Sequence, residues 1–191
     1  MTSRTHDLFA FASLVTVAVN YPPVSLNVTT LVAASVGSIV GSLLPDIDQA
    51  SNRLWDLLPA GHVFGRVLKN LFLHHRTISH SLLGIFILNG ALSWLFPKLF
   101  NPNFINVQII YYAIMVGFIS HLFLDGFTEE GIPLFFPLKW KIGFPPIASW
   151  RIKTGQWFEK LVVFPGIVVY LLYFSFQNQK NLGGILKLVV R

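Results

Sequence analysis

Long apolar runs separated by short polar stretches dominate the chain. Five of these runs contain few or no charged residues, and they cover residues 8–19, 28–44, 81–96, 104–124 and 161–176. A helix needs about 20 apolar residues to cross the hydrocarbon core of a bilayer. The shorter runs must therefore tilt or extend into their flanking residues. The pattern predicts an all-α, polytopic membrane helical bundle with about five membrane-embedded helices.

The first two runs raise questions of processing and packing. The first run is short and follows Arg4, as the apolar region of a signal peptide would, but residues 18–20 (AVN) lack the usual small-x-small cleavage site. We therefore expect a retained helix, although it is the weakest of the five spans. The second run contains Gly37 and Gly41 in a GxxxG pair. Such small residues let helices approach closely, and we favour packing within the bundle over dimerisation.

Composition supports a lipid environment and limits the possible chemistry. The 191 residues are 53% hydrophobic and only 12% charged, whereas soluble chains carry about 25% charged residues. The mean hydropathy is +0.62. The chain has no cysteine, which excludes a disulfide framework, thiolate metal sites, iron–sulfur clusters and a cysteine nucleophile. Any metal must bind through nitrogen and oxygen. No repeat or linker divides the sequence, so residues 1–191 are expected to form one integral-membrane domain.

The positive charge predicts an orientation rather than a nucleic-acid partner. The net charge of +6 comes from Lys and Arg that lie mostly between the apolar runs, where membrane orientation explains them. With a cytoplasmic N-terminus, the cytoplasmic side would hold Arg4, Arg53, Arg66, Lys69, Arg76, Lys139, Lys141, Arg151, Lys153 and Lys160. The other side would hold Lys98, Lys180, Lys187 and Arg191. The positive-inside rule then favours a multi-pass protein of the cell membrane with its N-terminus inside.

The ionisable residues at the ends of the runs all fall on this same side. They are His6, Asp7, Asp46, Asp48, His74, His75, His80, His121, Asp125 and Glu159. Ionisable groups at membrane depth are costly unless they pair, bind a metal or line a wet cavity. Their convergence from five segments predicts one His/Asp cluster at one membrane face.

Two short motifs carry the most specific spacing. His121 and Asp125 are four residues apart, so on a helix they share a face and can hold one cation, or Asp125 can orient the imidazole. A hydrogen-bonded pair without metal is the alternative. Pro45 is followed by Asp46 and Asp48, and because proline disrupts a helix, the two carboxylates are expected at the interface. They could bridge two metals, or one could bind while the other accepts a proton; a hydrated acidic loop is the alternative.

The segment 74–81 (HHRTISHS) brings imidazoles to the start of the third run. His75 and His80 are five residues apart, which does not align on an ideal helix. We therefore expect His75 on the preceding turn and His80 in the first helical turn, with Ser79 or Ser81 as the helix cap. His74 has the weaker claim and a solvated or supporting role. Glu159 lies four residues after Gly155 at the start of the last run, where a lone Glu is as often interfacial as a ligand.

Taken together, these motifs resemble the membrane-bound metal-dependent hydrolases of the LexA-regulated inner-membrane type. The matching segments are Thr5-His6, LLPDID at 43–48, HRTISHSLLG at 75–84, ISHLFLDGFTEEGIPLFFP at 119–137 and the step from Gly155 to Glu159. Ser79 stands where that family usually has Thr. The resemblance extends to zinc-dependent phospholipase C and P1-type nucleases. It implies that two or three divalent ions, Zn²⁺ first and Mn²⁺ or Fe²⁺ otherwise, are bound by His6, Asp46, Asp48, His75, His80, His121, Asp125 and Glu159.

The resemblance also implies a reaction. A metal-activated water would cleave a phosphoester, plausibly of a lipid or lipid-linked molecule, at the cytoplasmic face. A carboxylate that is not a ligand, with Asp48 and Glu159 as the candidates, would serve as general base. Arg76, inside the His motif, is the first candidate to bind phosphate, and the further candidates on the same side are Lys139, Lys141, Arg151 and Lys153. Two other classes stay open. A metal or proton transporter would place its site near the bilayer midplane, and a non-catalytic membrane protein could use a closed structural metal site. Membrane lipids are the expected partners, and the sequence leaves the oligomeric state open.

Overall fold

The computed structural model describes the whole chain except residues 48, 50–51, 58–60, 62–76, 139 and 190–191. The regular secondary structure of the described residues is all helical and includes no strand, as the sequence predicted. The α-helices are α1 (Ser3–Asn20), α2 (Val28–Leu43), α4 (Leu82–Leu99), α5 (Val107–Asp125), α6 (Phe164–Gln177) and α7 (Gln179–Val189). Short 3-10 turns cover Leu44–Asp46, Trp55–Leu57 and Ala148–Trp150, and a π-helical turn, Glu159–Val163, leads into α6.

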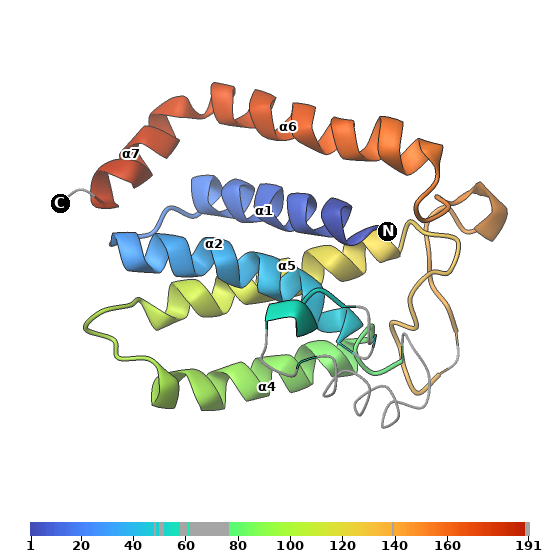
Figure 1. Cartoon of the computed structure of the whole chain (residues 1–191), viewed down its shortest axis with the longest axis horizontal. Coiled ribbons are helices and arrows are strands. Elements are labelled where there is room, and N and C mark those ends of the chain that lie inside the picture. Colours follow the sequence, from blue (N-terminus) through green and yellow to red (C-terminus); the bar gives the residue numbers. More distant parts are fainter. Residues whose placement is uncertain (48, 50–51, 58–60, 62–76, 139, 190–191) are drawn as a thin grey trace.

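Helices α1, α2, α4, α5 and α6 lie side by side and alternate in direction along the chain (Figure 1). Helices α1, α2 and α5 pack against one another, α4 packs on α5, and α6 lies along α1. The two termini lie at opposite ends of the bundle. The N-terminus shares its end with the turn after α2, the start of α4 and the long connection between α5 and α6 (Figure 1). This arrangement brings the ionisable ends of the helices together.

Four stretches of the described chain are long and apolar enough to cross a membrane. They are Val28–Asp46, Leu82–Leu99, Val107–Asp125 and Glu159–Gln177. Helix α1 forms as predicted but is not among them, so the count of spans differs from the expected five. Arg4, His6 and Asp7 lower the hydropathy of its first two turns, and it packs against α2 and α5 instead.

Small residues set the close approach of α2 and α5. A Cβ atom added at Gly41 would lie 2.2 Å from the carbonyl oxygen of Ile114, and one added at Gly117 would lie 1.9 Å from the carbonyl oxygen of Ser38. Real side chains do not tolerate such distances, so only glycine permits this backbone contact. The GxxxG pair of the second run therefore packs within the bundle, as the sequence indicated.

The outer helices present apolar side chains away from the bundle. Phe86 and Trp94 on α4 and Leu172 and Phe176 on α6 are all more than half exposed. In water such surfaces would be a liability, but in a bilayer they contact lipid. Helix α7 was not predicted, because its 11 residues include Gly183 and Gly184 and are too short for a span.

Candidate metal centre

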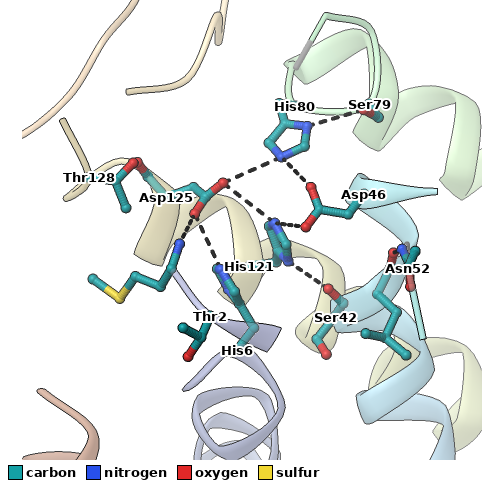
Figure 2. Close-up of polar contacts among 12 residues, drawn as sticks. Thr2, His6, Ser42, Asp46, Asn52, Ser79, His80, His121, Asp125 and Thr128 are labelled. Carbon is teal, nitrogen blue, oxygen red and sulfur yellow. Dashed lines mark hydrogen bonds and ion pairs between the residues drawn. The ribbon is translucent and has the colours of Figure 1, made fainter. Parts of the chain in front are cut away.

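Four segments bring five His and Asp side chains to one point at the N-terminal end of the bundle. Figure 2 shows them converging: His6 comes from α1, Asp46 from the turn after α2, His80 from just before α4, and His121 and Asp125 from the last turns of α5. The side chains of His6, His80, His121 and Asp125 are at most 2% exposed, whereas Asp46 is 25% exposed. Asp46 is thus the member that solvent can reach.

Local sequence explains how two of these residues are positioned. Pro45, which has no backbone N–H, lies in the 3-10 turn Leu44–Asp46 that follows α2, and this turn carries Asp46. Ser81 caps α4, because its Oγ accepts a hydrogen bond from the Gly84 backbone amide at 3.3 Å. His80 therefore lies just before the helix rather than in its first turn, and Ser81 is the cap that the sequence proposed as one of two. The Ser79 hydroxyl lies 3.1 Å from His80 Nδ1.

The donor atoms of the cluster are spaced as metal ligands would be. Asp125 Oδ1 lies 3.2 Å from His6 Nε2, and Asp125 Oδ2 lies 3.5 Å from His80 Nε2 and 3.6 Å from His121 Nε2. Asp46 lies 3.5 Å from His80 and 3.8 Å from His121, through its two oxygens. Ligands about 2.0–2.1 Å from a tetrahedral Zn²⁺ are about 3.4 Å apart. The observed distances therefore fit a divalent cation bound by nitrogen and oxygen.

Among the described residues, two overlapping groups of three side chains are close enough to bind one metal ion each. One contains His6, His121 and Asp125, and the other contains Asp46, His80 and His121, each with its donor atoms within 4.8 Å of one another. The HxxxD pair in α5 thus shares a face, as its spacing predicted.

The protonation of His121 is set by its backbone partner. Its Nδ1 lies 2.6 Å from the carbonyl oxygen of Ser42. A carbonyl can only accept a hydrogen bond, so Nδ1 carries the proton and donates it. In a neutral ring the lone pair is then on Nε2, which faces the Asp46 and Asp125 carboxylates and has no hydrogen-bond partner among the described residues. A lone pair against two carboxylates is unfavourable unless a proton or a cation lies between them.

The other imidazoles are held tightly against His121. The rings of His6 and His121 stack with centroids 3.8 Å apart, and the His80 ring meets His121 edge-on at 5.4 Å. Burial lowers the pKa of His80 below its usual value, against the raising effect of Asp125. Its imidazole is therefore neutral at neutral pH, which is the form that binds metal. The amino group of Met1 donates to Asp125 Oδ1 at 2.8 Å.

A small cavity of about 70 Å³ opens beside the cluster. It is lined by Ser3, His6, Ser42, Leu43, Asp46, Gln49, Asn52 and His121. The lining contains polar side chains from α1, α2, the turn after α2 and α5. The cluster therefore borders a space that can admit water and a polar group, which a closed structural site would not need.

Sequence reasoning missed the polar contacts of Asn52 and Ser42, which line this cavity, and the pairing of Asp7 with Arg53 next to them. Asn52 is buried and donates from Nδ2 to the carbonyl oxygen of Leu43 at 2.6 Å. The hydroxyl of Ser42 donates to Asp7 Oδ1 at 3.0 Å, and Arg53 donates to Asp7 Oδ2 at 2.5 Å. Asp7 had been noted only as one of the ionisable residues, and no spacing in the sequence pairs it with Arg53.

Glu159 is placed apart from the cluster. Its Oε1 accepts hydrogen bonds from the backbone amide and hydroxyl of Thr2 and from the hydroxyl of Thr5, and its Oε2 accepts one from the Gly155 amide at 2.7 Å. Gly155 has φ +75°, a conformation that favours glycine. Glu159 is in neither triad. In this geometry it joins the start of α1 to the π-helical turn before α6, while its proposed ligand and base roles stay predictions.

Several proposed residues cannot be placed, and some cations have other partners. Asp48, His75 and Arg76 lie outside the described residues, as do His74, Arg66, Lys69 and Lys139. Arg151 donates to the carbonyl oxygens of Pro145 and Pro146, within the connection between α5 and α6. Lys153 pairs with Glu129 at 3.6 Å. Arg151 and Lys153 therefore contact their own loop in this structure rather than the cluster.

Comparison with known proteins identifies the family. Residues 1–186 match the family described as YdjM inner membrane protein, and the chain belongs to it. It is 32% identical to the uncharacterized protein YvsG of Bacillus subtilis over 92% of this chain and 95% of that protein. It is 28% identical to the inner membrane protein YdjM of Escherichia coli over 65% of this chain and 58% of that protein. No solved structure matches significantly.

These findings correct one interpretation of the sequence. The resemblance of the motifs to LexA-regulated hydrolases and, beyond them, to zinc-dependent phospholipase C and P1-type nucleases was wrong as a family assignment, because residues 1–186 match a family that is described only as an inner membrane protein. The named relatives carry no hydrolase description either. His and Asp residues at the ends of spans define a ligand chemistry, and that chemistry does not by itself define an enzyme class. The assignment as a multi-pass membrane protein stands.

Proposed function

We propose that this member of the YdjM inner membrane protein family is a divalent-metal-dependent hydrolase that cleaves a phosphoester of a lipid or lipid-linked molecule. The observation that carries the proposal is His121 Nε2, whose lone pair faces two carboxylates within 3.8 Å. Because the Ser42 carbonyl fixes the proton on Nδ1, a cation is the simplest group that satisfies this arrangement. Zn²⁺ suits the imidazole and carboxylate donors best.

The residues of the cluster would have different roles in metal binding and in contact with the substrate. Asp125, which is buried, and His6, His80 and His121 would hold the ions. Asp46 is partly exposed and lines the cavity, so it is the carboxylate that an incoming water or substrate would meet. When bound, a divalent ion supplies Lewis acidity and makes water a better nucleophile near neutral pH.

The cavity favours an enzyme over a closed structural site, and the location favours it over a transporter. Ions in transporters bind near the bilayer midplane, whereas this cluster lies at the ends of α2 and α5. A lipid substrate could reach the membrane end of the bundle from the side. We further propose that the end of the bundle with the N-terminus faces the cytoplasm, because it carries Arg4 and Arg53 and the positive-inside rule favours that orientation.

Elemental analysis of detergent-purified protein tests the proposal first. Wild type should retain at least one equivalent of a divalent metal per chain, and His121→Ala and Asp46→Asn should lose most of it. Asp56→Asn is the matched control, because Asp56 is an exposed carboxylate on the same connection. The same four samples are then assayed on bis-p-nitrophenyl phosphate and on phospholipid vesicles.

The outcomes separate the three classes. Metal and hydrolysis lost together in the two cluster variants, and kept in Asp56→Asn, support the hydrolase. If wild type retains metal but hydrolyses neither substrate, the hydrolase proposal is wrong and the metal has a structural or transport role. Substoichiometric metal in wild type removes the metal centre from the proposal altogether.

A further inference from the structure

The connection that follows α2 holds an arginine, Arg53, directly after Asn52, which lines the cavity. On one side of Arg53, buried Asn52 donates to the Leu43 carbonyl and accepts from the Leu54 amide. On the other side, Trp55 is 4% exposed and donates from Nε1 to the Gln49 carbonyl at 3.1 Å. Arg53 thus lies between two buried anchors, so its backbone is fixed although its side chain is 57% exposed.

The guanidinium is linked to the cavity wall through Asp7. Asp7 follows His6 on α1 and accepts a hydrogen bond from Ser42, and both His6 and Ser42 line the cavity. Arg53 donates one N–H to Asp7. An arginine has five N–H donors in a planar fork. In the part of the chain that the structure describes, the Arg53 side chain forms no hydrogen bond other than the one to Asp7, while its backbone carbonyl accepts one from the Asp56 amide.

The charge of this corner fits an anion. The residues that line the cavity include the anionic Asp46 and no Lys or Arg. With Asp125, the described cluster contains two carboxylates and three imidazoles, and the Met1 ammonium pairs with Asp125 at 2.8 Å. One divalent ion, together with this ammonium, would outweigh the two carboxylates and leave an excess of positive charge, so an anionic group could approach. Arg53 is a cation near this site, and its guanidinium is held by one carboxylate, that of Asp7.

We infer that Arg53 forms a phosphate-binding subsite at the rim of the cavity, with Asp7 as the group that holds the guanidinium in place until an anion arrives. The inference rests on the proposed function and deepens it, because it assigns the substrate an oxyanion group beside the ester that the metal centre attacks. Arginine binds phosphate through two parallel N–H donors. In the sequence analysis, Arg53 served only to predict the orientation of the chain in the membrane, and the geometry now assigns it a role in binding.

The test measures binding of inorganic phosphate to purified protein whose metal content has been determined, by isothermal titration calorimetry. Arg53→Ala should weaken phosphate binding about tenfold, and Arg53→Lys should lose less, since it keeps the charge without the planar fork. Lys153→Ala is the matched control: Lys153 is also a paired cation in a connection at this end, with its side chain 54% exposed against 57% for Arg53. It should change phosphate affinity less than twofold.

Asp7→Asn distinguishes a ligand-binding arginine from a purely structural ion pair. If the pair only fastens the connection to α1, Asp7→Asn and Arg53→Ala should have the same effect. If Arg53 binds phosphate, Asp7→Asn should leave phosphate affinity equal or tighter, because asparagine keeps an oxygen that can accept from the guanidinium while the competing negative charge is removed. Equal weakening by the two variants would overturn the inference, and so would a wild type that binds no phosphate.

The failure of this inference can be told apart from failure of the proposed function. Metal present at full occupancy with phosphate affinity unchanged in Arg53→Ala refutes the subsite and leaves the metal centre. Metal absent from wild type refutes the proposed function, and phosphate affinity then reports on Arg53 alone.

Discussion

Alanine substitutions of helical glycines on α2 and α5 should destabilise the protein to different degrees, depending on how closely the two helices pack at each position. At Gly117 an added methyl group would lie 1.9 Å from the Ser38 carbonyl oxygen, and at Gly41 it would lie 2.2 Å from the Ile114 carbonyl oxygen. Both neighbours are backbone atoms and cannot turn aside. At Gly37 the nearest atom is a side-chain carbon of Ile114, at 3.2 Å, which can adjust. At Gly90, on α4, nothing lies within 4 Å.

The expected loss of stability follows from how far α2 and α5 must move apart to accommodate the added methyl group. Reaching an ordinary contact of about 3.4 Å requires α2 and α5 to separate by about 1.2 Å at Gly41 and about 1.5 Å at Gly117, and overpacking of this kind typically costs about 1–3 kcal/mol. We expect Gly117→Ala and Gly41→Ala to lie near the upper end, at about 2–3 kcal/mol each, and Gly37→Ala below about 1 kcal/mol. Gly90→Ala should cost nothing, because alanine is the better helix former.

The consequence reaches the cluster, because α5 carries His121 and α2 ends beside Asp46. Separating the two helices lengthens the 2.6 Å contact between His121 Nδ1 and the Ser42 carbonyl. Gly117→Ala and Gly41→Ala should therefore also weaken metal retention, which Gly90→Ala should leave unchanged.

Thermal unfolding in detergent, followed by size-exclusion chromatography of heated samples, measures the series. A loss of about 2–3 kcal/mol corresponds to a decrease of about 5–10 °C for a chain of this size. The expected order of melting temperatures is Gly90→Ala highest, then Gly37→Ala, then Gly41→Ala and Gly117→Ala. If the last two melted together with Gly90→Ala, the backbone contact between α2 and α5 would not exist in the folded protein.

Three further predictions concern the metal, Glu159 and the connection after α2. Zn²⁺ at about a hundred times its dissociation constant should stabilise the chain by about 2.7 kcal/mol by mass action. EDTA should reverse the rise in melting temperature and His121→Ala should abolish it, whereas a rise that persists in His121→Ala would place the ion elsewhere. Glu159→Gln should lower the melting temperature by several degrees and keep the metal content, because the carboxylate accepts hydrogen bonds from Thr2, Thr5 and Gly155; metal loss would return Glu159 to the ligand set. Asn52→Ala removes the 2.6 Å bond to the Leu43 carbonyl, worth about 1 kcal/mol. Faster limited proteolysis after α2 should follow, and an unchanged cleavage rate would contradict the anchoring role.

The order of apolar runs was enough to predict most of the bundle. The predicted runs 28–44, 81–96, 104–124 and 161–176 agree within a few residues with the four candidate spans. Alternation of the runs also predicted that His6, Asp46, His80, His121 and Asp125 would share one end, and they do. The HxxxD spacing of His121 and Asp125 predicted a shared face, because helical periodicity is a local property.

The tertiary structure decided which atoms meet, because contacts between helices depend on their relative rotation and shift, which no periodicity encodes. The partner of His121 Nδ1 is a backbone carbonyl on α2, and a carbonyl leaves no trace in the side-chain sequence. Glu159 has its hydrogen bonds with the start of α1 and with Gly155, although its position at a span entrance resembled that of the clustered residues. The pairing of Asp7 with Arg53 joins residues 46 positions apart. The sequence by itself thus determined the membrane class, the helices and the donor types of the cluster, whereas only the packing of α1, α2 and α5 determined which donors face one another and which cation lies at the rim.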